Sequence, residues 1–202
     1  AGLNNLFGEV TWFYPGSGAA SNNRSVTYNY MDSTAERPIW TTSSLARSTW
    51  SDSHIFGKPH GTEYDADATS DATVGNTEGV TTYYEHETGT NQIKAGATTA
   101  IAASIQSGDF DLDQRGLAGD GEFMMKIRRV IPDFLQQTGA ARVTLNLKNY
   151  PTDTEASSSL GPFEVDSDTT KIDTRARARA IALKVDNTTI TQHWKLGTFR
   201  LD

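Results

Sequence analysis

The sequence predicts an all-β protein, in which a partial β-propeller blade or meander is followed by an antiparallel β-sandwich. Apolar side chains alternate with polar ones in several segments, which is the pattern of a strand because successive side chains point to opposite faces. Glycine, proline and asparagine separate these segments, as expected for turns, and no segment shows a long helical period. We therefore expect a propeller-like meander over residues 1–93 and a sandwich domain over residues 94–202.

The composition narrows the range of functions. The chain has 202 residues, no cysteine, and 18 basic against 25 acidic residues, for a formal net charge of -7. Without cysteine it forms neither a disulfide nor a thiolate metal site. An acidic chain is poorly suited to tight binding of duplex DNA, which requires basic patches that displace counterions. No apolar run approaches the ~20 residues that cross a bilayer, so we expect no membrane span.

A hairpin is predicted near the start of the first domain. Residues 9–14 and 26–30 each alternate at period two, and the loop 15–23 between them is rich in turn-forming residues. Residues 36–40 and 45–50 predict two further short strands. A four-stranded unit of this kind, rich in aromatic residues, fits one blade of a propeller.

Aromatic side chains are concentrated in these strands: Trp12, Phe13, Tyr14, Tyr28, Tyr30, Trp40 and Trp50. The favoured interpretation is packing between propeller blades. The alternative is a sugar-binding face, since aromatic rings stack on sugars.

Residues 61–99 are rich in threonine, aspartate, glycine and alanine, and the pattern there is weak. Within them only residues 80–86 predict a strand, with a turn at 88–91, and we place the domain boundary near residue 93. The chain begins and ends close to strand-like patterns, from which we expect it to be a piece of a longer protein.

The second domain shows clearer alternation. Its predicted strands are residues 101–110, 122–131, 142–147, 163–165, 174–185 and 194–201. In the second of these, Phe123, Met125, Ile127 and Ile131 are expected on the buried face. Two packed antiparallel sheets are the economical way to bury so many apolar faces.

A row of arginines lies in the strand predicted at residues 174–185. These arginines share parity with the aliphatic residues that follow them: Arg175, Arg177 and Arg179, then Ile181, Leu183 and Val185. The favoured explanation is a β-bulge near Ala180 that exchanges the two faces. The alternative is a straight strand whose arginine stems cover an apolar rim. The row either contacts another subunit or a phosphate, or it faces water beside acidic residues.

An acidic segment, Asp109 to Asp113, resembles the start of a calcium loop, with Asp120 behind it. The EF-hand pattern requires glycine at its sixth position, where this chain has Gln114. We therefore interpret Asp109, Asp111 and Asp113 as the outer face of a strand end, and we predict no metal site.

The chain shows no recognisable catalytic pattern. The histidines His54, His60, His86 and His193 have no zinc spacing, and neither a nucleophile elbow nor a phosphate-binding loop is present. His86 lies between Glu85 and Glu87, which would raise its proton affinity. We expect no catalytic residue, no cofactor and no enzymatic activity.

Several segments carry a likeness to a known family: residues 110–134 with Arg128-Arg-Val-Ile-Pro-Asp133, 175–185 and 194–202, supported by 9–15, 28–30 and 45–47. Together they resemble the C-terminal part of the tail tube or nozzle proteins of tailed bacteriophages, mainly short-tailed ones. The resemblance implies a propeller decorated by sandwich domains and a virion location, within a ring that is commonly six-fold around the DNA exit channel. The propellers of this family are longer than residues 1–93, in agreement with a piece of a longer chain.

The resemblance also implies partners. These are copies of the chain itself, neighbouring tail proteins such as the adaptor and fibres, and genomic DNA that passes without specific binding. An acidic channel wall would repel phosphates and let the genome slide. The row Arg175, Arg177 and Arg179 would then meet the acidic segment Asp109, Asp111 and Asp113, on a neighbour or within the same domain.

Two other functions remain open. One is a carbohydrate-binding module or tail-associated glycan hydrolase that uses the aromatic residues of the first hairpin and acids such as Glu9. The other is a cell-surface adhesion sandwich.

Overall fold

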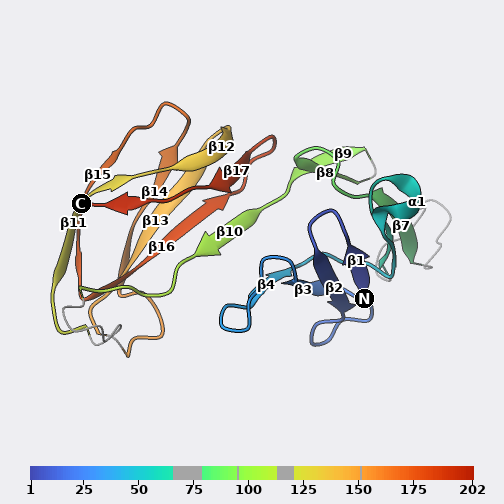
Figure 1. The fold of residues 1–202 in the computed structure, drawn as a ribbon, viewed down its shortest axis with the longest axis horizontal. Helices are drawn as coiled ribbons and strands as arrows, with labels where there is room; N and C mark the ends of the chain where they lie inside the picture. The colour runs from blue at the N-terminus through green and yellow to red at the C-terminus, as the bar shows by residue number, and fades with distance from the viewer. Residues whose placement is uncertain (66–78, 95, 113–120, 151) are drawn as a thin grey trace. The chain divides into compact units, whose positions relative to one another are not determined.

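The computed structural model describes residues 1–65, 79–94, 96–112, 121–150 and 152–202. Within them the chain consists of antiparallel strands and one single-turn helix (Figure 1), so the all-β class is confirmed. It divides into a first unit, Ala1–Gly89, and a second unit, Thr90–Asp202. The division falls after Gly89, whereas the boundary predicted from the sequence was near residue 93.

Two antiparallel sheets make up the described part of the first unit, in the orders β1-β2-β3-β4 and β5-β6-β7. Their bounds are β1 Gly2–Asn4, β2 Glu9–Tyr14, β3 Arg24–Asn29, β4 Ile39–Ser43, β5 Thr49–Ser51, β6 His60–Asp65 and β7 Val80–Glu85, with helix α1 Ser53–Phe56 between β5 and β6. The predicted hairpin is confirmed as β2 and β3. Strands β1 and β6 were missed, and β5 belongs to the second sheet and does not continue the meander.

Trp50 joins the two sheets of the first unit. Its indole Nε1 donates a hydrogen bond to the carbonyl of Leu3 at 2.8 Å, and its ring centroid lies 5.6 Å from that of Phe13. A Cβ at Gly2 would lie 2.4 Å from Trp50 Cγ. Only glycine therefore allows β1 to approach the indole this closely.

The second unit contains two larger sheets, ordered β10-β16-β13-β14 and β15-β11-β18, and two strand pairs, β12-β17 and β8-β9. The bounds are β8 Asn91–Lys94, β9 Ala97–Ala100, β10 Ala103–Gln106, β11 Met125–Ile131, β12 Phe134–Thr138, β13 Ala141–Lys148, β14 Ser158–Val165, β15 Ile172–Ala178, β16 Ala180–Asn187, β17 His193–Leu196 and β18 Arg200–Leu201. The hairpin β8-β9 was missed because its residues are mostly polar or small.

One hydrophobic core draws side chains from both larger sheets of the second unit. Val143, Leu145 and Leu147 of β13 are buried, as their alternation predicted. Ile127 and Val130 of β11 belong to the same cluster. The two sheets are therefore held together by a shared apolar interior, which supplies most of the stabilisation of such a unit.

The predicted buried face of β11 is partly wrong. The pairing register of β11 with β15 shifts between Ile127 and Arg129, as at a β-bulge, and a bulge moves later side chains to the other face. Val130 is consequently buried, whereas Ile131 is only half-buried. Phe123, expected inside, precedes the strand and is exposed.

The strand predicted at residues 174–185 is interrupted close to the position where a change of face was predicted, between its arginines and its aliphatic residues. Strand β15 ends at Ala178 and β16 begins at Ala180, and the chain bends at Arg179 from one sheet into the other. In place of the expected β-bulge, the chain crosses here from one sheet to the other. The alternative of one straight strand over residues 174–185 is wrong. Arg179 Nη1 donates to the carbonyls of Gly121 and Glu122 at 2.9 and 3.0 Å, which fixes the bend.

Candidate functional site

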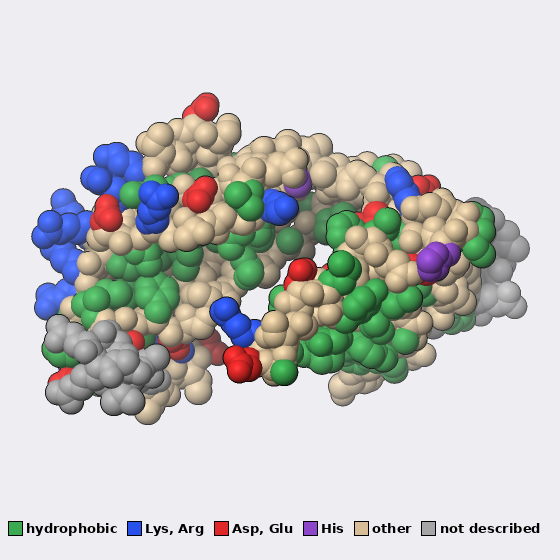
Figure 2. Space-filling view, in the orientation of Figure 1, with side chains coloured by type: hydrophobic (Ala, Val, Ile, Leu, Met, Phe, Trp, Pro, Cys, Tyr) green, Lys and Arg blue, Asp and Glu red, His purple; other side chains and the backbone are tan. Residues whose placement is uncertain are grey.

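Strand β2 and its neighbours place their aromatic side chains on one side of the first sheet. Opposite residues in the pairing are Val10 with Tyr28, Trp12 with Val26, and Tyr28 with Trp40. Paired residues share a face, so these five side chains form one surface. We call Val10, Trp12, Val26, Tyr28 and Trp40 the aromatic face. Figure 2 shows hydrophobic side chains gathered over this part of the first unit.

The other side of the same sheet carries mostly small polar side chains, together with Phe13, which packs against Trp50. Thr11 and Ser25 are buried, and the Thr11 and Thr27 hydroxyls lie 2.8 Å apart. Trp12 and Trp40, by contrast, are 40 % and 53 % exposed. The sheet is thus inverted with respect to the usual rule, because its apolar side is the one in contact with water.

The rings of the aromatic face pack against one another. The Trp40 centroid lies 4.7 Å from that of Tyr28 and 6.1 Å from that of Trp12, with interplanar angles of 36° and 32°. These distances are typical of aromatic pairs. The rings therefore form one contiguous apolar patch.

A second surface lies on the outer side of the β15-β11-β18 sheet. Lys126 pairs opposite Arg177, and Arg200 pairs opposite Ile131, while the alternate residues of these strands point into the core. We call the exposed cations of this side the basic face: Lys126, Arg128, Arg175, Arg177 and Arg200. Figure 2 shows lysine and arginine side chains gathered where Figure 1 places β11 and β15.

The basic face has no acidic partner in the described part of the chain. The acid that forms ion pairs on this sheet, Asp173, is already bound to Arg129 and Lys171, each at 3.1 Å. Hydrogen bonds from Lys171 and Arg129 lower the pKa of Asp173. Lys126 and Arg177 therefore oppose each other as like charges, an arrangement that costs stability in the isolated sheet.

The structure separates the residues that the sequence grouped as a possible subunit contact. Arg175 and Arg177 lie on the basic face, but Arg179 is at the bend between sheets. Asp109 binds Lys148 at 2.6 Å, and the Asp111 carboxylate accepts the Gly121 amide at 2.9 Å. Asp113 lies outside the described residues, as does Asp120. The described acids are thus engaged within their own unit.

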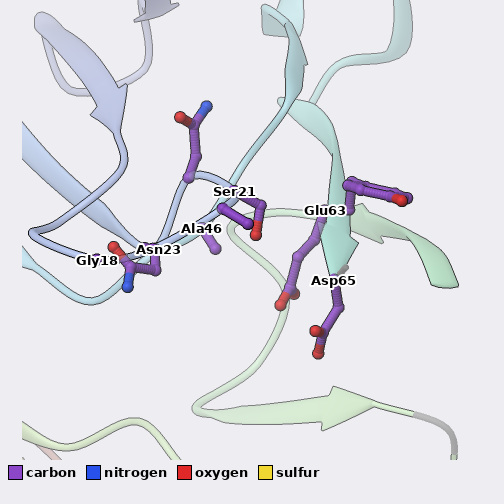
Figure 3. Close-up of a pocket in the computed structure, with 10 residues that line it drawn as sticks. Gly18, Ser21, Asn23, Ala46, Glu63 and Asp65 are labelled. Carbon is purple, nitrogen blue, oxygen red and sulfur yellow. The ribbon is translucent and has the colours of Figure 1, made fainter. Parts of the chain in front are cut away.

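No cluster of three or more side chains suited to a metal ion occurs among the described residues. A depression of about 260 Å³ opens on the first unit. Figure 3 shows Glu63 and Asp65 projecting from β6 toward it, opposite the loop that carries Gly18 and Asn23. Glu63 also lies 3.6 Å from the Arg47 guanidinium, so at least one of these carboxylates has a structural counterion.

Arg47 and His86 form a polar core in the first unit. Arg47 is buried, its Nε donates to His86 Nε2 at 2.9 Å, and its guanidinium carbon lies 4.0 Å from the centre of the Tyr84 ring. Burial, aided by the positive charges of Arg47 and His60, lowers the pKa of His86 from 6.5 to about 4. The sequence-based expectation of a raised proton affinity is wrong, because Glu85 and Glu87 point outward while His86 points inward.

Acidification should therefore destabilise the first unit. The unfolded chain takes up a proton on His86 near pH 6.5 and the folded chain only near pH 4, so stability falls as the pH falls between these values. With allowance for the exposed part of the ring, we expect a loss of about 1–2 kcal/mol. His86→Gln should remove this part of the pH dependence, measured as the melting temperature of the first unit at several pH values.

The matched control for that measurement is His193→Gln, which lies in the other unit. Glu9 opposes the trend, because burial and the charge of Glu87 raise its pKa. The comparison of variant with wild type isolates the histidine from Glu9. A pH dependence unchanged by His86→Gln would contradict the assignment.

Part of the aromatic face and part of the basic face could be predicted from the sequence. Lys126 and Arg128 alternate with apolar residues and so signal an outward cationic side. Arg200 joins them only through the pairing of β18 with β11, which no local pattern reveals.

The comparisons with known proteins give no family. No model of a known protein family matches the sequence, and no curated protein is significantly similar to it. The described residues contain no helix that is long and apolar enough to cross a membrane.

Proposed function

We propose that this protein is a structural subunit of a bacteriophage tail nozzle or tube, and that its aromatic face packs against a neighbouring subunit. The observation that carries the proposal is the inverted first sheet. A sheet that exposes Trp12 and Trp40, leaves Tyr28 half-buried and buries Thr11 and Ser25 would be poorly designed for an isolated domain. Such a sheet suits a subunit whose apolar side is covered on assembly.

The remaining features fit an assembly protein. Large exposed aromatic and arginine side chains are typical of the residues that contribute most to protein interfaces. Under this proposal the β1–β4 sheet is a propeller blade, the second unit is a sandwich domain, and copies of the chain contact one another head to tail to close a ring. The proposal takes up the resemblance of residues 110–134 and 194–202 to tail nozzle proteins.

Carbohydrate recognition is the second candidate, because exposed aromatic rings also bind sugars. The rings of the aromatic face contact one another instead of forming a spread platform. Glu9, the acid considered for glycan hydrolysis, alternates with Val10 and so lies on the opposite side of the sheet from the aromatic face. A glycan held on the aromatic rings would therefore be out of reach of that carboxylate.

Sedimentation velocity of the chain, together with a glycan array, tests the proposal. We expect the chain to form one large species of defined size as its concentration rises, and to bind no glycan. Glycan binding by a chain that stays monomeric at every concentration would contradict the proposal and favour the carbohydrate-binding alternative.

A further inference from the structure

The two units of this chain differ in net charge. The basic face belongs to the second unit, which has no net charge. The first unit has 4 basic and 11 acidic residues, a net charge of -7, whereas the second has 14 of each. The entire acidic excess of the chain is therefore in residues 1–89. Within the neutral second unit, the basic face is a local concentration of cations that form no ion pair with the acids that the structure describes.

The basic face is arranged to receive an anionic surface. Its side chains project from adjacent antiparallel strands, about 5 Å apart across the sheet and about 7 Å apart along each strand. Arg175, Arg177 and Lys126 make no ion pair or side-chain hydrogen bond in the described part of the chain. An anionic partner would relieve the opposition of Lys126 and Arg177 and would gain charge-assisted hydrogen bonds from the guanidinium groups.

We propose that the basic face docks on the acidic first unit of a second copy of this chain. Charge complementarity selects this occupant, because the chain carries its own excess of carboxylates in the first unit and a cationic surface in the second. The acidic segment that the sequence suggested as the partner does not serve, since Asp109 and Asp111 are bound within the second unit. The inference rests on the proposed function, for which it supplies one of the contacts between subunits.

Such a contact joins two different surfaces and so is heterologous. Repetition of a heterologous contact closes a ring when the rotation between copies permits it. A polyanion such as single-stranded DNA is the competing ligand for a row of arginines. The net charge of -7 on the first unit disfavours it, because the excess negative charge of the chain repels phosphates.

Zero-length carbodiimide crosslinking of an equal mixture of ¹⁴N- and ¹⁵N-labelled chains tests the contact, since it joins lysine amines to carboxylates in direct contact. We expect peptides of mixed isotope that join Lys126 to an acid within residues 1–89. Crosslinks of Lys126 within a single chain only, crosslinks only to acids of the second unit, or none would overturn the inference.

A charge reversal provides the second arm. Arg177→Glu places a carboxylate opposite Lys126, so the sheet should fold at least as well as in the wild type. We expect association at low salt to weaken about tenfold. Lys195→Glu, an exposed lysine on β17, is the matched control and should associate as the wild type does.

The outcomes separate this inference from the proposed function. Association that survives Arg177→Glu unchanged but is lost when the aromatic face is altered would overturn the basic contact and leave the structural role intact. Absence of association under all conditions would overturn both. Binding of a labelled single-stranded DNA that is lost in Arg177→Glu, with no crosslink between chains, would assign the face to nucleic acid instead.

Discussion

Replacing Trp12 and Trp40 together with serine is expected to abolish self-association of the chain while both units remain folded. The two indoles are 40 % and 53 % exposed and part of their buried area is against each other, so their removal costs the folded subunit only part of the packing of two core tryptophans. Buried aromatic anchors at an interface typically contribute about 2 kcal/mol or more each. Because the two rings contact each other, their effects are not additive, and we expect a loss in affinity of about 100- to 1,000-fold.

Sedimentation equilibrium measures this loss. The matched control is the pair Ile55→Ser and Phe56→Ser in α1, since these side chains are 78 % and 62 % exposed but lie away from the aromatic face. The control variant should associate with wild-type affinity. Equal losses in both variants would show that general surface hydrophobicity, and not the aromatic face, drives association.

Replacing Leu145 with alanine is expected to lower the free energy of unfolding of the second unit by about 3–4 kcal/mol. Leu145 is fully buried on β13, with Leu160 of β14 and Leu183 of β16 beside it in the sheet. Truncation removes apolar contacts and leaves a cavity at the centre of the sheet that joins these strands. Trp194 is the single tryptophan of the second unit and the other three lie in the first, so the resolved fluorine NMR signal of Trp194 in a fluorotryptophan-labelled chain follows this unit with denaturant.

Leu135→Ala is the control for the core variant. Leu135 lies on β12 of the same unit and is 68 % exposed, so its truncation should change stability by no more than about 0.5 kcal/mol. If the two variants unfold at the same denaturant concentration, the core does not lie where the structure places it.

The sequence predicted well those elements whose pattern is purely local. Strand β13 alternates without interruption from Ala141 to Lys148, and its buried face was predicted correctly. The sequence predicted a change of face near Ala180, and the strand breaks one residue earlier, at Arg179. The prediction was possible because alternate residues share a face, and arginines and aliphatic residues cannot both lie on a buried face. That the chain crosses there between two sheets depends on partners distant in sequence, so no local pattern could show it.

Other elements lacked a sequence pattern. Because of the bulge in β11, Val130 and not Ile131 lies on the buried face. Nothing in the order of apolar residues indicates this register shift. Strands β1 and β9 are short, and small or polar residues predominate in them, so their propensity for strand is weak.

For the candidate surfaces too, the local patterns were predictable from the sequence and the features that depend on distant partners were not. The aromatic residues of the first hairpin and Arg175 and Arg177 were found from the sequence. Which side of each sheet faces water could not be predicted, because that depends on what the opposite side packs against. For the first sheet the partner is Trp50 of the β5-β6-β7 sheet, which packs on the side of Phe13 and Thr11, while Trp12 and Trp40 on the other side are exposed.

Electron microscopy of the assembled protein tests the central claim most directly. We predict closed rings with a fixed number of copies, in which Trp12, Tyr28 and Trp40 of each subunit are buried against the next. Isolated subunits, or an assembly in which the aromatic face remains in water or holds a glycan, would contradict the structural role proposed for this protein.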